Sequence, residues 1–519
     1  MTLEDMLEAA AQRYGDKAAI ICGERRLSYT EFNSAANKMA SALKKLGVSR
    51  GQRVAMLLSS SPEFAVIYFG IVKIGAIAVP LDTKYKAGEL SCLFDDNRPS
   101  VLVSEKPYLD TVAPLLDRLS YIKNVIDVTP GAGRFLSYEQ IIAAESGRAV
   151  AGGAVPDDVA HIAYTSGPTL RPHGVMLLHG NLAKAAAISA GGFKQTDKDI
   201  VTLFALPMHH AVGLVVIMLT SLYAGSTVIM LTGLSIHGLL ETIEREKATI
   251  FMGVPFVHVL LLREVAAGGI RYDIGSLRLC ASAGAPLPLE IIDRYRELLG
   301  RELIQFYGLT EATCHVTCQP VDGGGKDGYV GPALPGFQIK VVDDAGRELG
   351  PNQPGEIIIS GPIMSGYYNN PRATDEAIRD GWLYTGDIGS IDEEGDIVIL
   401  GLKKPMLIVK GQNIYHSDVE DVIATHPKVA EVTAVGIADP DGMRGEVVRA
   451  VIQLKPGQAA REAEIKRYCL ARLANYKVPK QVIFVANLPR MPGGQVNKEA
   501  LKDLLPGVSS GSRVNTKIN

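Results

Sequence analysis

Short apolar runs alternate with helix-like stretches over about the first 300 residues of the chain. The runs lie at 53–58, 76–80, 100–103, 201–204, 249–252 and 277–281. Apolar runs that alternate with helices are typical of βαβ units, whose parallel strands are buried on both faces of a sheet. The pattern therefore predicts an α/β fold with large, mostly parallel sheets.

The pattern changes over 327–400, where short strands follow one another at turns rich in Gly, Pro and Asp. Strands are expected at 338–343, 356–360 and 396–400. A run of short strands joined by such turns is typical of an antiparallel arrangement. We therefore expect a small β-barrel-like subdomain over 327–400.

A third pattern begins near residue 403, where helices and strands mix over a short stretch. Helices are expected at 417–424 and 462–473, and strands at 429–436 and 446–454. This mixture predicts a small α+β domain. The predicted domains are therefore an N-terminal domain over 1–402, a C-terminal domain over 403–506 and a loose tail over 507–519.

The segment 211–233 carries no charged residue and is long enough to cross a membrane. Gly and Ser within 223–226 interrupt it, however, and such residues favour a turn. We therefore expect a buried helix, a turn and a strand at 227–231, with no membrane span.

Composition narrows the class of partner. The formal net charge is −3 over 519 residues, and no Lys/Arg-rich run is present. Both observations argue against nucleic acid as the main partner. The six cysteines are scattered, which favours a reducing compartment, so a cytoplasmic protein is expected.

The segment 164–175 is the strongest candidate for a binding loop, and it reads YTSGPTLRPHGV. It follows an apolar strand-like run and precedes a helix-like run that begins near residue 179. Backbone N–H groups and hydroxyls in a loop between a strand and a helix can converge on phosphate oxygens. The segment therefore predicts an anion-binding loop.

This loop resembles the phosphate loop of the adenylate-forming superfamily, which includes acyl-CoA synthetases, firefly luciferase and peptide-synthetase adenylation domains. The resemblance is to the acyl-CoA ligase branch and spans nearly the whole chain. It implies that a carboxylic acid and ATP form an acyl-adenylate with Mg²⁺, and that a thiol such as CoA then attacks it. It also implies a mobile C-terminal domain that rotates between the two half-reactions.

Further motifs follow in the order of this family. The segment 305–312 reads QFYGLTEA, and the resemblance implies that Tyr307 and Gly308 flank the base, Thr310 touches the α-phosphate and Glu311 holds the metal. A carboxylate suits a hard cation that bridges phosphates. Taken alone, this segment is equally well a turn with a solvated Glu, so the order of the motifs carries the resemblance.

The resemblance also assigns the rest of the site. Thr165 and Ser166 belong to the AMP-binding loop, Asp387 accepts from the ribose hydroxyls, and His210 lies in the gate segment. Gly411 belongs to the loop that lines the thiol tunnel. The resemblance thus implies that His210 and Gly411 are the candidate catalytic residues. The segment expected to lie against adenine consists of Gly284, Ala285 and Pro286.

Six positions depart from the family pattern, and most of them concern the first half-reaction. Lysine or arginine is usual at three of them, now occupied by His173, Leu402 and Gln495. The hinge residue, Lys404, is followed by a proline, which restricts its backbone to extended conformations. The three remaining departures are Pro168, Leu170 and Pro405.

These departures leave three hypotheses. In the first hypothesis, the chain forms a thioester from CoA and an acyl-adenylate that a separate adenylating ligase supplies, and its own adenylation is impaired. In the second, the chain is a complete AMP-forming acyl-CoA synthetase that uses ATP and Mg²⁺. In the third, it is a non-catalytic protein that binds acyl-AMP or CoA. Under each hypothesis the ligands are CoA and the AMP moiety of an acyl-adenylate.

Overall fold

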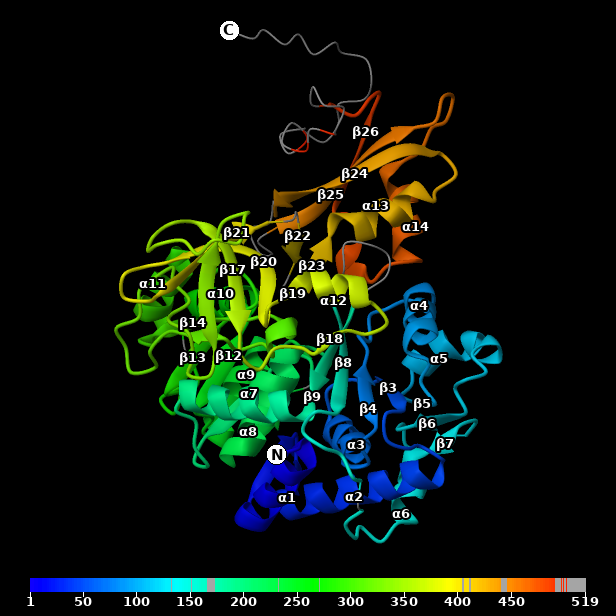
Figure 1. Ribbon diagram of the computed structural model, residues 1–519, viewed down its shortest axis with the longest axis vertical. Coiled ribbons are helices and arrows are strands. Elements are labelled where there is room, and N and C mark those ends of the chain that lie inside the picture. The colour runs from blue at the N-terminus through cyan, green and yellow to red at the C-terminus, as the bar shows by residue number, and fades with distance from the viewer. Residues whose placement is uncertain are drawn as a thin grey trace. The chain divides into compact units, whose positions relative to one another are not determined.

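The computed structural model describes most of the chain (Figure 1). The described residues are 1–131, 133–150, 152–165, 173–231, 233–269, 271–403, 406–409, 412–439, 446–490, 496, 498 and 501. They fall into two compact units. The larger unit holds nearly all of the described chain up to residue 403, and the smaller unit holds the described residues from 406 onward together with Lys84–Leu93.

The first sheet of the larger unit has eight strands, and its central strands are parallel. In spatial order they are β15 (Thr317–Cys318), β14 (Leu303–Tyr307), β13 (Leu279–Ser282), β12 (Ile250–Gly253), β10 (Ile200–Leu203), β11 (Thr227–Met230), β1 (Ala18–Cys22) and β2 (Arg25–Ser28). The pairing of β1 with β11 joins segments about 200 residues apart in the sequence.

The second sheet also has eight strands and is parallel except for the pairings that β9 makes. In spatial order they are β18 (Gly366–Tyr367), β9 (His173–Leu178), β8 (Val159–Thr165), β4 (Ile77–Pro80), β3 (Arg53–Leu57), β5 (Val101–Ser104), β6 (Asn124–Asp127) and β7 (Leu136–Ser137). These two sheets confirm the predicted α/β fold.

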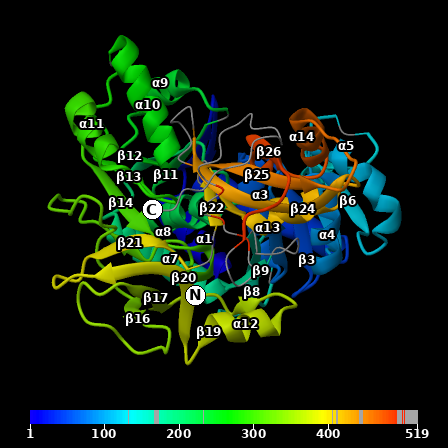
Figure 2. The ribbon, with the colours of Figure 1, turned by 90° about the horizontal axis from the view of Figure 1, so that it is seen from above.

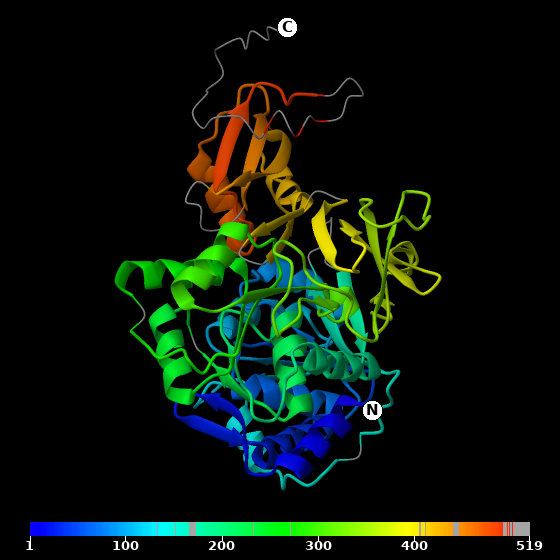
Figure 3. The same ribbon diagram turned by 90° about the vertical axis from the view of Figure 1, so that its left-hand side faces the viewer.

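Helices pack on both sheets of the larger unit (Figures 1 and 3). They are α1 (Leu3–Tyr14), α2 (Tyr29–Lys45), α3 (Pro62–Lys73), α5 (Tyr108–Val112), η1 (Ala113–Arg118), α6 (Tyr138–Ala143), α7 (His179–Gly192), η2 (Val212–Leu219), α8 (Thr220–Ala224), α9 (Ile236–Glu246), α10 (Pro255–Gly268), α11 (Leu289–Leu299) and η3 (Thr310–Ala312). A further helix, α4 (Ala87–Asn97), has its first residues in the smaller unit and its last residues in the larger one. α7 packs against β8 and β9 of the second sheet and against η2 and α8, which belong with the first. One apolar core therefore runs through both sheets.

Local sequence explains where several helices begin. Thr2 and Ser28 each cap a helix, and the acid three residues later completes a capping box in both cases. α3 starts at Pro62 after the cap Ser61 and is buried almost throughout. Its last residue, Lys73, is fully buried and pairs with Glu8 at 2.7 Å.

The segment 211–233 forms η2, α8, a turn at Gly225 and β11, as its sequence predicts. One detail differs, because η2 is π-helical rather than α-helical. π-Helical turns are frequent at functional sites. No helix of the described chain combines the length and the apolar character needed to cross a membrane.

The third sheet is antiparallel and has five strands, which lie side by side in Figure 2. They are β16 (Gln338–Val342), β17 (Gly355–Ser360), β20 (Trp382–Ile391) and β19 (Ile378–Arg379) in spatial order, with β21 (Ile397–Leu402) on β20. A short helix, α12 (Pro371–Ala377), precedes β19. The predicted antiparallel character of this region is confirmed.

The smaller unit mixes helices with two small sheets. Its elements are β22 (Met406–Val409), β23 (Gln412–Tyr415), α13 (His416–Ala424), β24 (Val429–Ala438), β25 (Glu446–Leu454), α14 (Glu462–Leu470), η4 (Asn475–Lys477) and β26 (Gln481–Val485). β24, β25 and β26 form a three-stranded sheet, whose core includes Ile414, Ile423 and Ile465. The predicted small α+β domain is confirmed, and its exact residue limits stay a prediction.

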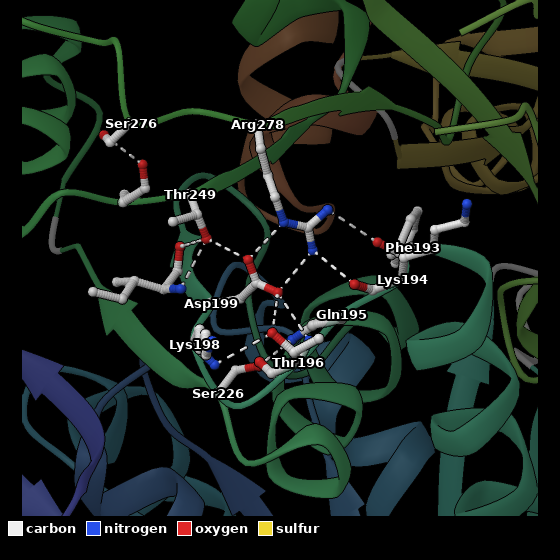
Figure 4. Close-up of polar contacts among 12 residues, drawn as sticks. Phe193, Lys194, Gln195, Thr196, Lys198, Asp199, Ser226, Thr249, Ser276 and Arg278 are labelled. Carbon is white, nitrogen blue, oxygen red and sulfur yellow. Dashed lines mark hydrogen bonds and ion pairs between the residues drawn. The ribbon is translucent and has the colours of Figure 1, made fainter. Parts of the chain in front are cut away.

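A buried carboxylate holds the amino ends of the first sheet together (Figure 4). Asp199 precedes β10 and accepts hydrogen bonds at 2.7 Å from both Nε and a terminal nitrogen of Arg278, which precedes β13. Thr249, which precedes β12, donates to the same carboxylate at 2.7 Å. Burial acts to raise the pKa of Asp199, but these hydrogen bonds outweigh it and hold the pKa below its usual value.

This pair should contribute measurably to stability. Replacing Arg278 by Met leaves the charge of Asp199 buried without its main partner, since the Asp199 side chain is only 5% exposed. We expect a loss of about 3 kcal/mol, the lower end for a broken buried pair because Arg278 is partly exposed. Urea unfolding followed by the fluorescence of Trp382, the one tryptophan of the chain, measures the loss.

The control is Arg372→Met, which removes an arginine that pairs with Glu376 on the surface of α12. Exposed pairs contribute little, so this variant should lose only a small fraction of the stability lost in Arg278→Met. Equal losses in the two variants would contradict the structural role of the Asp199–Arg278 pair.

Candidate active site

The parallel strands β13 and β14 are neighbours in the first sheet. Two of the predicted motifs follow their carboxyl ends and therefore lie at the same edge of this sheet. β13 is followed by Gly284, Ala285 and Pro286, and β14 ends at Tyr307. The carboxyl ends of parallel strands are the usual place for ligands in such sheets. Residue 308 must be glycine for packing reasons, because a Cβ there would lie 2.2 Å from the carbonyl oxygen of Cys314.

Tyr307 and Asp387 are brought together although 80 residues separate them. The Tyr307 hydroxyl donates a hydrogen bond to the Asp387 carboxylate, which lies in β20 of the third sheet. Burial raises the pKa of Asp387 to about 6; the Tyr307 hydrogen bond opposes this, and the charges of Glu311 and Glu356 add to it. Asp387 therefore changes its charge close to neutral pH.

Glu311 lies near the same position, in η3 directly after β14. The Tyr367 hydroxyl donates to its Oε1 at 3.2 Å, and the Met364 N–H donates to its backbone carbonyl at 2.7 Å. Burial raises the pKa of the Glu311 carboxyl, and the Tyr367 hydrogen bond partly opposes the shift. Thr310 is the first residue of the same short helix.

His173 reaches this cluster through an aromatic contact. Its ring meets the edge of Tyr367, with centroids 4.7 Å apart and planes at 81°. His173 is the first residue of β9 and pairs with Thr165, the last residue of β8, so the two mark the ends of the predicted phosphate loop. Ser166, Pro168 and Leu170 lie outside the described residues.

Leu402 lies directly opposite Asp387, the predicted ribose-binding residue. It pairs with Asp387 across β20 and β21, and directly opposed residues of a ladder share one face of the sheet. The side chain at the arginine position of the family thus lies beside the predicted ribose-binding carboxylate. Lys404, Pro405, Gly411 and Gln495 fall in parts of the chain that the structure does not describe.

His210 lies just before η2, and its N–H donates to the carbonyl of Pro207 at 3.0 Å. Its ring lies against that of His209, with centroids 4.4 Å apart. Asp82, which follows β4, is close to His209. Sequence reasoning singled out His210 but overlooked Asp82, which has no motif to mark it.

Tyr367 was likewise not predicted as a site residue. The Gly-Tyr pair at 366–367 is recognisable as a further family match, but nothing in the sequence indicates that its hydroxyl reaches Glu311. That contact depends on β18 pairing with β9, which carries Tyr367 to the phosphate-loop side of the second sheet.

The donor set fits the ligands that the resemblance implies. Glu311 offers a partly buried carboxylate, and a divalent cation such as Mg²⁺ favours carboxylate and phosphate oxygens over other ligands. Asp387 offers acceptor oxygens for a ribose diol, beside the aromatic ring of Tyr307. When bound, Mg²⁺ would neutralise phosphate charge, and Glu311 would be the protein residue that holds it.

Comparison with known proteins agrees with this geometry. Residues 7–368 match the profile of the AMP-binding enzymes, and residues 418–495 match that of the AMP-binding enzyme C-terminal domain. The chain belongs to the AMP-binding enzyme family. It falls in the acyl-CoA ligase branch of the adenylate-forming superfamily, so it is an acid–thiol ligase of the acyl-CoA synthetase type.

Three relatives of this AMP-binding enzyme illustrate the range of the branch. A long-chain-fatty-acid–CoA ligase of Escherichia coli O157:H7 is 32% identical, over 97% of this chain and 94% of the relative. An indoleacetate–CoA ligase of Aromatoleum aromaticum is 32% identical, over 97% and 98%. The structure of an o-succinylbenzoate CoA synthetase from Bacillus subtilis matches with a TM-score of 0.85 and 28% identity, over 96% and 98%.

The raised pKa of Asp387 predicts a pH-dependent affinity for the nucleoside. In the role that the resemblance implies, the ionised carboxylate of Asp387 would accept from ribose hydroxyls, and ionisation is lost as the pH falls through about 6. Adenosine affinity should therefore be constant above about pH 7 and fall up to tenfold per unit below about pH 6. Calorimetry from about pH 5 to about pH 8 measures this, since adenosine keeps its charge there. The control variant Asp387→Asn should show an adenosine affinity that does not change with pH. A pH-independent affinity of the wild type would contradict the role of Asp387.

Placing an arginine opposite Asp387 should move this profile. In Leu402→Arg the guanidinium lies across the ladder from the carboxylate, and a neighbouring cation lowers a carboxyl pKa by about one unit or more. The midpoint of the adenosine profile should move to lower pH by that amount. The matched control is Leu400→Arg, which adds the same charge at an exposed position of β21; an equal shift there would exclude a specific cross-strand effect.

Proposed function

We propose that this AMP-binding enzyme forms an acyl-CoA thioester from an acyl-adenylate and CoA, and that its own ATP-dependent adenylation is impaired. The main support is that three positions where the family usually has lysine or arginine are occupied here by His173, Leu402 and Gln495. In the family resemblance, the lysines at 173 and 495 serve only the step in which carboxylate and ATP react, and the arginine at 402 reaches the ribose and phosphate. A separate adenylating ligase would then supply the acyl-adenylate.

The proposed reaction is a simple acyl transfer. The sulfur of CoA attacks the carbonyl carbon of the acyl-adenylate, the bond from that carbon to the phosphate oxygen breaks, and AMP leaves with the electron pair. The thiol proton passes to a base or to water. No β- or γ-phosphate takes part, so this step has no use for the cations that hold pyrophosphate.

The position of Leu402 supports the proposal. Its apolar side chain lies beside Asp387, so the neighbour that would counter both this carboxylate and a phosphate is uncharged. The raised pKa of Asp387 is in keeping with that loss. Binding of a neutral ribose does not require the missing charge, whereas stabilising a developing phosphate charge does.

Lys498 supports the proposal because its charge is already engaged within the smaller unit. Its Nζ lies 3.0 Å from Oε1 of Glu420 and 3.4 Å from Nδ1 of His416. The same Glu420 oxygen accepts from the Ala434 N–H at 2.7 Å and from the Thr433 hydroxyl at 3.0 Å. Lys498 is therefore a poor substitute for the lysine that Gln495 replaces.

A complete ATP-dependent acyl-CoA synthetase is the second candidate. Glu311 is retained and lies partly buried beside Tyr367, where it would hold Mg²⁺, and thioester formation alone does not explain its presence. In that case His173 would have to act in place of a lysine.

Two assays on one enzyme preparation distinguish the candidates. The first supplies a carboxylic acid, ATP, Mg²⁺ and CoA, and the second supplies the pre-formed acyl-adenylate and CoA. We expect the second rate to exceed the first by about 10²–10³-fold, because one preorganised charged contact commonly contributes that much. Equal rates, or ATP–pyrophosphate exchange as fast as thioester formation, would refute impaired adenylation.

Restoring the lysine should raise only the ATP-dependent rate. In Gln495→Lys an ammonium group returns to the position that the resemblance places beside the reacting carboxylate and phosphate. We expect the first assay to gain about tenfold or more and the second to stay unchanged. The control, Asn497→Lys, adds the same charge two residues away; a similar gain there would show a general charge effect instead.

A further inference from the structure

Asp82, His209 and His210 bring three metal-binding side chains together in the larger unit. Asp82 follows β4 of the second sheet, and the two histidines lie between β10 of the first sheet and η2. One ligand atom from each residue lies within 4.8 Å of the other two. Within the described ranges, no other set of three His, Cys, Asp or Glu residues meets this condition.

The separation of two of these atoms suits a shared ion. Nε2 of His209 lies 3.5 Å from Oδ1 of Asp82, which is longer than a normal N–H···O hydrogen bond. Two ligands at about 2.1 Å from a tetrahedral zinc ion are roughly 3.4 Å apart. The observed distance therefore corresponds to two corners of a zinc coordination sphere.

Burial and ligand chemistry indicate which ion fits. The side chains of Asp82 and His209 are 3% and 6% exposed, and buried charges are normally paired or bound to metals. Two imidazoles with one carboxylate favour Zn²⁺ and similar ions, whereas Mg²⁺ prefers oxygen ligands. The group is thus chemically distinct from the single carboxylate of Glu311.

The backbone around the histidines is held in place before any ion binds. The Met208 N–H donates to the hydroxyl of Ser60 at 2.9 Å, and the His210 N–H donates to the Pro207 carbonyl at 3.0 Å. Gly213 allows this turn, because a Cβ there would lie 2.4 Å from the Pro207 oxygen. A preorganised backbone reduces the entropy that ligand ordering would otherwise cost.

We propose that Asp82, His209 and His210 bind one Zn²⁺ ion per chain, with a fourth position open to water. Binding would hold the ring of His210, the gate histidine, and so make zinc a reversible inhibitor of the enzyme. Position 209 decides the ligand set: beyond the six departures named above, the family resemblance also implies an aromatic side chain here, which would offer no metal ligand, whereas this chain has His209. Zinc sensitivity is therefore expected to be a property of this chain that its aromatic-bearing relatives lack.

Equilibrium dialysis of the chelator-treated full chain against Zn²⁺ near pH 7.5 tests the site directly. We expect one zinc per chain, unaffected by excess Mg²⁺. Asp82→Asn and His209→Phe should each weaken binding at least tenfold. The control His237→Ala removes an exposed histidine that lies 2.9 Å from Glu264, and it should leave the stoichiometry and affinity unchanged.

Co²⁺ as a spectroscopic probe separates this site from the cysteines. Nitrogen and oxygen ligands should give visible bands without the thiolate charge-transfer absorption that Cys314 and Cys318 would produce. Far-UV circular dichroism and Trp382 fluorescence establish that the variants are folded. Absence of zinc from the wild type, thiolate bands, or undiminished binding in folded Asp82→Asn and His209→Phe would each overturn the proposal.

Inhibition is a separate readout. The ratio of thioester-forming rates with and without zinc should fall in the wild type and stay near one in His209→Phe. Only this ratio depends on the proposed function, since dialysis measures binding without turnover. A His209→Phe variant that is inhibited as strongly as the wild type would refute the inhibitory role.

Discussion

The parallel pairing of β10, β12, β13 and β14 is the constraint on which the rest of the active site depends. Strands that run in one direction send all of their carboxyl ends to the same edge. The amino ends are held at the opposite edge by the carboxylate of Asp199, which binds residues that precede β12 and β13. The amino ends of these strands are thus held by a structural hydrogen-bond cluster, and the carboxyl ends carry the candidate active site.

Two carboxyl groups, those of Glu311 and Asp387, lie near the carboxyl end of β14. Glu311 and Asp387 are both partly buried, and loss of solvation raises the pKa of each. Their hydrogen-bond donors are the neutral hydroxyls of Tyr367 and Tyr307. Hydroxyl donors favour the ionised carboxylate without neutralising it, so the site keeps its attraction for cations and for ribose hydroxyls.

Under the proposed function, substitutions in this setting would affect the two half-reactions unequally. A leucine opposite Asp387 removes a charge from the place where ribose and phosphate would meet. Thioester formation moves no pyrophosphate, so it depends less on that charge than adenylation does. The ammonium of Lys498 is already bound to Glu420, which limits how far this lysine could compensate.

Much of the fold could be predicted from the sequence because buried parallel strands read as apolar runs. The split of 211–233 into helix, turn and strand followed from Gly and Ser at 223–226. The π-helical form of η2, which contacts α7 and α8, has no signal in the hydrophobic pattern of the segment. Pairings such as β1 with β11 also have no local signal.

The sequence by itself determined the family, the α/β class and the identity of the residues that depart from the family pattern. These properties are local, because each lies in a short motif or in a hydrophobic period. Only the tertiary structure decided that Leu402 lies opposite Asp387, that Tyr367 donates to Glu311 and that Asp82 lies beside His209. Leu402 and Asp387 lie on consecutive strands whose register no short motif specifies. The other two contacts join residues far apart in the chain, and strand pairing and sheet packing, which no single segment encodes, bring them together.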